Sequence, residues 1–103
     1  MAVPTRAEAL ESYGVLSVEL AAVRREYAVV LYSEKETKVH AFAQAQGTDK
    51  NRDHVANFNA LPLTKDSMRL ANEIAALEAE RDFLQYAITY GYNPGPATPG
   101  VSP

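Results

Sequence analysis

Two histidines and their acidic neighbours are the residues of this sequence best suited to metal or acid–base chemistry. Glu36 and His40 are four residues apart, so on a helix they share a face and could bind one metal ion. Asp53 directly precedes His54 and could pair with it as acid and base. Zinc sites need three or four converging ligands, and no other residues here have ligand spacing. We therefore interpret both as solvated polar pairs and expect no metal, no cofactor and no catalytic residue.

A group of basic residues suggests contact with an anionic partner. It consists of Arg24, Arg25, Lys35, Lys38 and Arg52. Phosphate-binding surfaces carry such cations. Glutamates interleave with these residues, however, which is typical of a solvated coiled-coil face, and the formal net charge of the chain is −3. Nucleic-acid binding is therefore an open but less favoured interpretation.

Length and composition restrict the class of protein. The chain has 103 residues and no cysteine, which allows one small domain and excludes a disulfide framework. Residues 1–10 have no apolar segment of the secretory type, and no apolar run approaches the roughly 20 residues of a membrane span. We expect a cytoplasmic protein without a membrane partner.

The elements that must position these residues are helices, most clearly in the stretch 63–91. Leucines and isoleucines recur there at alternating spacings of four and three, which places them on one helical face, and Arg81 interrupts their line. Thr64 suits the N-cap and Gly91 the C-terminal stop, so we predict a helix over about 64–90. The apolar line is Leu70, Ile74, Leu77, Leu84 and Ile88, and a second line beside it is Ala76, Phe83, Ala87 and Tyr90.

A first long helix is predicted over about 5–46. Thr5 and Glu8 form a capping-box pattern, Gly47 ends the helix, and Gly14 is a place where it can bend. An alternative is a buried strand over 27–32, where β-formers are frequent. The apolar line of the helix is Leu10, Tyr13, Leu16, Leu20, Val23, Tyr27 and Val30.

The rest of the chain is assigned to a connector and a tail. We expect residues 47–63 to connect the helices, with a short helix capped by Thr48 or Asp49. Residues 92–103, rich in proline and glycine, predict a disordered tail. The fold class is thus all-α: an antiparallel helical hairpin over 1–91, with an unpaired overhang on the first helix. Pairing of two hairpins into a dimeric helical bundle would cover the remaining apolar surface.

Three features of the run 26–88 stand out together. They are Glu26-Tyr27, Gly47-Thr48 followed by Arg52, and the segment from Leu70 to Leu84 that contains Ile74-Ala-Ala-Leu77. With these features the run resembles small helical-hairpin proteins encoded by tailed bacteriophages. It implies a small accessory protein of the infected bacterial cell that docks on a host protein or on phage replication or recombination machinery. A virion-assembly or scaffold role is the alternative.

An enzyme is the least favoured interpretation. Length and charge resemble the small all-helical chorismate mutases, which clamp carboxylates with cations, but the sequence around those positions differs from that family's. The residues in roughly suitable places are Arg6, Arg24, Lys35, Arg52 and Gln85. We expect instead a non-enzymatic module whose dimer or partner interface consists of Leu70, Ile74, Leu77, Phe83, Leu84, Ala87 and Tyr90.

Overall fold

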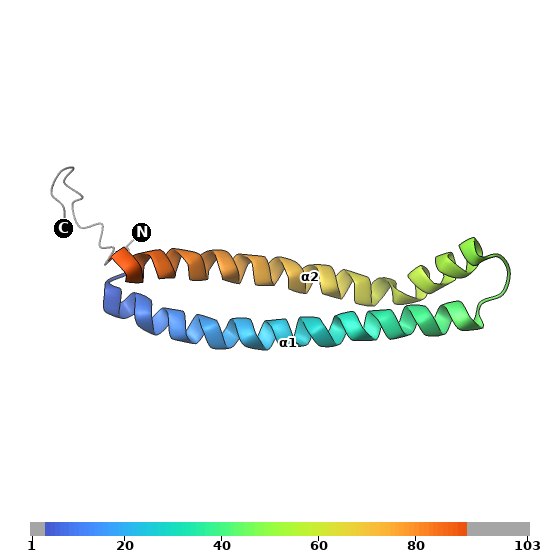
Figure 1. Ribbon diagram of the computed structural model, residues 1–103, viewed down its shortest axis with the longest axis horizontal. Helices are drawn as coiled ribbons and strands as arrows, with labels where there is room; N and C mark the ends of the chain where they lie inside the picture. The colour runs from blue at the N-terminus through green and yellow to red at the C-terminus, as the bar shows by residue number, and fades with distance from the viewer. Residues whose placement is uncertain (1–3, 91–103) are drawn as a thin grey trace.

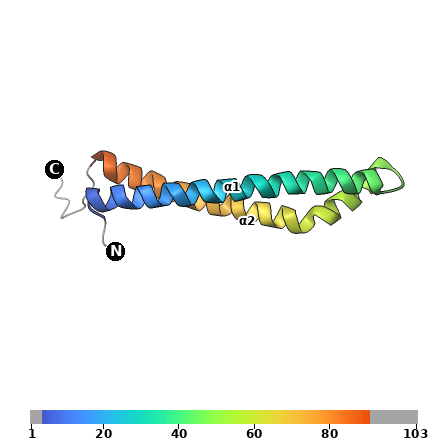
Figure 2. The same ribbon diagram turned by 90° about the horizontal axis from the view of Figure 1, so that it is seen from below.

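Two long helices form the whole of the described structure. The computed structural model describes residues 4–90, in which α1 (Arg6–Gln44) and α2 (Asp49–Tyr90) lie antiparallel as a hairpin (Figures 1 and 2). No strand occurs among these residues, so the all-α hairpin is confirmed. At 1.5 Å per residue the helices are about 60 Å long, and the described part of the molecule is a rod.

The predicted first helix is confirmed. The Thr5 hydroxyl accepts the backbone N–H of Glu8, whose carboxylate accepts the backbone N–H of Thr5, as a capping box requires. The helix runs unbroken through Gly14 to Gln44. Residues 27–32 are helical, so the alternative of a strand is wrong. Gly47 has φ +103°, a backbone conformation that glycine adopts at little steric cost, and it reverses the chain.

The second helix begins much earlier than predicted. It starts at Asp49, where the Thr48 hydroxyl accepts the backbone N–H of Asn51, so Thr48 is the cap and the connector over 47–63 is wrong. Thr64 lies inside the helix and is not an N-cap. The prediction stopped at Pro62 because proline disfavours a helical conformation in the residue before it.

Pro62 bends α2 without ending it. Proline has no N–H for the helical ladder, and its ring presses on the carbonyl one turn earlier, so helices kink at this residue. Figures 1 and 2 show the bend in the yellow-green part of α2. Because α2 continues past the bend, α1 is paired along its length and the expected overhang is absent.

The two helices face each other along inner lines with alternating spacings of four and three. In α1 the predicted line is buried or half-buried from Tyr13 to Val30, but Leu10 is half exposed and Ala9 is buried in its place. In α2 the whole predicted line from Leu70 to Ile88 faces α1, including Arg81. The most deeply buried large side chains are Leu20 and Leu70.

The interface near the connector is made of small and polar residues. Ala56, Ala60 and Ser67 are the buried residues that α2 contributes there. Opposite them, Glu34 is half-buried, accepts a hydrogen bond from the Thr64 hydroxyl and lies 3.9 Å from the Lys38 ammonium. The apolar core is therefore concentrated in the half of the rod near the chain ends.

Two further expectations concern the C-terminal residues and membrane-spanning helices. Gly91 and the tail over 92–103 lie outside the described residues. Between residues 4 and 90, neither helix combines the length and apolar character needed to cross a membrane.

Candidate protein-binding surface

Most of the predicted interface lies inside the hairpin. Leu70, Leu84 and Ala87 are buried against α1, and Ile74 and Leu77 are half-buried on the same face. These five side chains therefore face the chain's own first helix, and Leu70, Leu84 and Ala87 have almost no surface left for a second molecule. The reason is that a two-helix hairpin uses its strongest apolar lines to hold itself together.

Phe83 and Tyr90 are the two predicted interface residues that remain at the surface. Phe83 is about half exposed and Tyr90 more so. The rings of Tyr86 and Tyr90 lie 4.6 Å apart, so the last two turns of α2 end in an aromatic group.

A line of exposed residues follows the face of α2 turned away from α1. Its large apolar members are among the most exposed in the molecule: Phe58 is 77% exposed and Met68 62%. The spacing alternates between three and four, which keeps the line on one face opposite the inner line. We call it the α2 outer line: Phe58, Leu61, Lys65, Met68, Asn72, Ala75, Ala79, Asp82 and Tyr86.

A similar line follows the outward face of α1. Val18 is 72% exposed and Val29 61%, and both lie opposite the buried Leu16, Leu20 and Val23. We call it the α1 outer line: Val15, Val18, Ala22, Arg25, Val29, Tyr32, Glu36 and Val39. Each helix thus has apolar residues on two opposite faces, only one of which is covered within the hairpin.

Sequence reasoning missed both outer lines, although a signal for each is present. Val15, Val18 and Ala22 already have three-and-four spacing, but the stronger leucine line of the same helix was taken as its only apolar face. Phe58, Leu61 and Met68 are in register across Pro62. They were missed because residues 47–63 were assigned to a connector.

The predicted basic group does not form one patch. The Arg24 guanidinium is 2.6 Å from the Glu78 carboxylate on the other helix, and the Lys38 ammonium is 3.9 Å from Glu34. Arg25 and Lys35 are exposed, with no ion pair among the described residues. Part of the positive charge of this group is therefore balanced by carboxylates within the hairpin.

Arg52 holds the connector in place. Its guanidinium lies 4.3 Å from the centre of the Phe42 ring, and its Nε donates a 3.0 Å hydrogen bond to the Phe42 carbonyl. A carbonyl in the last turn of α1 has no helical partner, and a cation there also complements the negative end of the helix dipole. Arg52 is therefore a C-terminal cap of α1 rather than a contact for an anionic partner.

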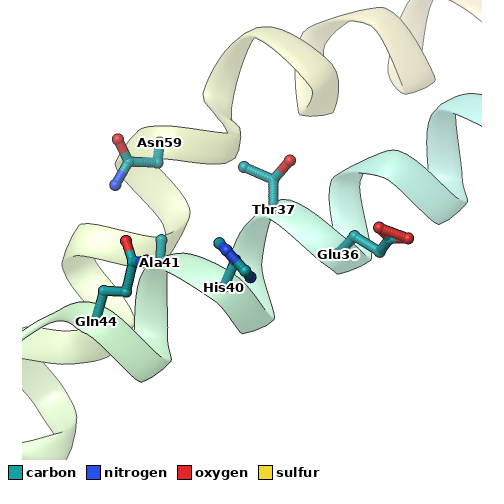
Figure 3. Close-up of a pocket in the computed structure, with 6 residues that line it drawn as sticks. All are labelled: Glu36, Thr37, His40, Ala41, Gln44 and Asn59. Carbon is teal, nitrogen blue, oxygen red and sulfur yellow. The ribbon is translucent and has the colours of Figure 1, made fainter.

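Glu36 and His40 line a shallow hollow with Thr37, Ala41, Gln44 and, from α2, Asn59. In Figure 3 the Glu36 carboxylate extends away from the His40 ring. Glu36 instead accepts a hydrogen bond from the Tyr32 hydroxyl, which raises the pKa of Tyr32 above its ordinary value. Among residues 4–90, no three His, Cys, Asp or Glu side chains gather as metal ligands would.

The cations considered for a chorismate-mutase-like site are spread along the rod. Arg6 begins α1 near the chain ends, whereas Arg52 lies by the connector (Figure 1). The Gln85 amide donates a 3.0 Å hydrogen bond to the Thr89 hydroxyl. A single hairpin does not bring these groups together around one substrate.

Comparison with protein-family models, with curated proteins and with solved structures gives no match.

Proposed function

We propose that this chain is a non-enzymatic protein-interaction module, and that the α1 outer line docks a partner protein. The observation that carries the proposal is the exposure of Val15, Val18 and Val29 along one face of a rigid helix. Exposed apolar side chains gathered on one face are a feature of protein-binding sites, and here Arg25 and Glu36 are the two charged residues among them. Because valine and alanine side chains are short, a second helix can lie close alongside the α1 outer line.

The charges beside the α1 outer line indicate the chemistry of that partner. Glu19 and Glu26 are exposed and seven residues apart, so they border the same edge of the line. A partner with basic residues along this edge would be attracted and held in register. By the resemblance noted above, the partner is a protein of the bacterial host or of phage replication or recombination, and the site of action is the host cytoplasm.

A virion-assembly role is a second candidate, favoured by the opposite directions of the two outer lines. One line faces away from α2 and the other away from α1, so the rod can contact two molecules at once. A scaffold or assembly chaperone needs such two-sided binding. Mass spectrometry of purified virions and of assembly intermediates would detect the chain in this case.

Affinity capture during infection tests the proposed function. The tagged chain is compared with the double variant Val18→Gln and Val29→Gln, in which glutamine favours the helix and removes the exposed valines. The matched control is Ala21→Gln with Ala28→Gln, two exposed positions on the same helix beside the line. We expect a replication, recombination or host protein with the native chain and the control, and about tenfold less with the valine variant. Equal capture by all three contradicts the proposal.

A further inference from the structure

We propose that the α2 outer line binds the same line of a second copy of this chain, with the two helices antiparallel and a two-fold axis beside Glu73 and Ile74. This interface is separate from the α1 outer line, so it goes beyond the proposed function and does not depend on it.

The register of the line permits this symmetry. Reversing the line about the point between Glu73 and Ile74 superimposes it on itself from Leu61 to Tyr86, because its spacings of three and four recur there in mirror order, whereas Phe58 falls opposite Thr89. Asn72 then lies opposite Ala75 of the second copy, and Leu61 opposite Tyr86 of the second copy. A two-fold interface requires such self-complementarity of a single patch.

The charges select the antiparallel direction. In this register Lys65 lies opposite Asp82 of the second copy, and the symmetry produces this pair twice. A parallel arrangement would instead place Lys65 against Lys65 and Asp82 against Asp82. Lys65 has no ion pair within the described residues, and the Asp82 side chain is 75% exposed, 3.8 Å from Arg81. Both groups are thus accessible to a partner.

The sizes of the side chains suit close packing at the axis. Ala75 and Ala79 lie near the centre, where small residues let two helices approach to about 8 Å. Larger apolar side chains, Leu61 and Tyr86, lie toward the two ends, where they would cover the edges of the contact.

The α1 outer line matches itself only over a shorter length. Reversing the full line about Tyr27 places Arg25 opposite Val29 and Glu36 opposite Val18, which would desolvate charges without matching them. The part from Ala22 to Val39 can pair Arg25 with Glu36, but the Glu36 carboxylate already accepts a hydrogen bond from the Tyr32 hydroxyl. Because the self-complementary part of the α2 outer line is longer, self-association is assigned to α2, and α1 is left for a different protein.

The area of contact sets the strength of the dimer. The self-complementary part of the line, from Leu61 to Tyr86, is about 38 Å long, and a strip about 10 Å wide gives about 400 Å² from each copy. The total of about 800 Å² is below that of stable interfaces and corresponds to a weak, transient contact. We expect a reversible dimer with a dissociation constant in the micromolar range.

Charge reversal combined with sedimentation equilibrium tests this interface in the full chain. The variants are Lys65→Asp, Asp82→Lys, their combination, and Glu80→Lys as a control on the same helix away from the line. Each single variant places like charges opposite each other twice and should raise the dissociation constant about tenfold. The combination restores opposite charges and should return the constant to within about threefold of the native value. Helical circular dichroism of each variant checks that the hairpin is intact.

Several results would overturn the proposal. A monomer mass for the native chain at about 100 µM shows that a second copy does not occupy the α2 outer line. Single variants that dimerise like the native chain or the control place the contact elsewhere. If the double variant dimerises as weakly as the single variants, the antiparallel pairing is excluded. None of these results affects docking at the α1 outer line, which the valine variant tests.

Discussion

Leu70 is, with Leu20, one of the two most deeply buried large side chains of the hairpin. It is 1% exposed and belongs to the inner line of α2. We predict that Leu70→Ala lowers the free energy of unfolding by about 2–5 kcal/mol, because it removes buried apolar contacts and leaves a cavity. Leu10→Ala is the matched control, since Leu10 is half exposed, and should cost no more than about 0.5–1 kcal/mol. Urea unfolding followed by circular dichroism measures both; equal losses would contradict the placement of the two leucines.

Glu8 gives the capping box a defined pH dependence. The backbone N–H and hydroxyl of Thr5 lower the pKa of Glu8 below its ordinary 4.5, so folding favours the charged form. Its contribution to stability is full above pH 4.5 and is lost as pH falls through the folded-state pKa. Glu8→Gln keeps the acceptor oxygen but not the charge. We predict a lower melting temperature than the native chain at pH 7 and a difference that shrinks toward pH 3. A difference independent of pH would show that the charge of Glu8 has no role.

At the scale of the helix, Pro62 is the most unusual feature of α2. A proline inside a helix costs about 3 kcal/mol relative to alanine, since one backbone hydrogen bond is missing and the ring crowds the preceding turn. Pro62 is exposed. We predict that Pro62→Ala raises the free energy of unfolding by about 1–3 kcal/mol and increases helical circular dichroism. A loss of stability would instead mean that the bend is needed to seat Ala56 and Ala60 on α1.

The helices were predicted from the sequence to different degrees. The first helix could be placed within two residues because a capping box and a glycine mark its ends. The apolar inner line of α2 could be predicted from Leu70 to Ile88, since leucines at helical spacing have few other interpretations. The start of α2 was not predicted, because Asn57, Asn59 and Pro62 argued against a continuous helix, although the apolar spacing on the outer face continues across Pro62. Only pairing with α1, through contacts such as Glu34 with Thr64, stabilises that part of the helix.

Arg52, beside the connector, shows a second reason why the role of a residue could not be predicted from the local sequence. Arg52 was grouped with the surface cations because it was assigned, with Lys50, to the connector. Its role depends on the Phe42 ring and carbonyl, which the chain reversal at Gly47 brings next to it. A contact between residues on different helices is set by the turn geometry and cannot be read from spacing within one helix.

At the scale of the whole molecule, the shape explains why so much apolar surface is exposed. Two helices can cover only one face of each other, and no third layer lies over the outer faces in residues 4–90. Both outer lines therefore remain in contact with solvent along the rod. The sequence alone suggested leftover apolar surface on α2 but located it beside Phe83 and Ala87. In the structure the exposed apolar surface of α2 lies opposite the inner line, because α1 packs on the inner line.

The outward face of α1 is the proposed docking site for another protein. Photo-crosslinking in infected host cells tests this site most directly, with a benzophenone amino acid placed at Val18 or Val29 and, as a control, at Ala28. Val29 and Ala28 are neighbours in sequence but about 100° apart around the helix. The account predicts a covalent adduct with one other protein from positions 18 and 29, and little or none from position 28. Adducts of equal yield at all three positions, or adducts only with a second copy of the chain, would contradict it.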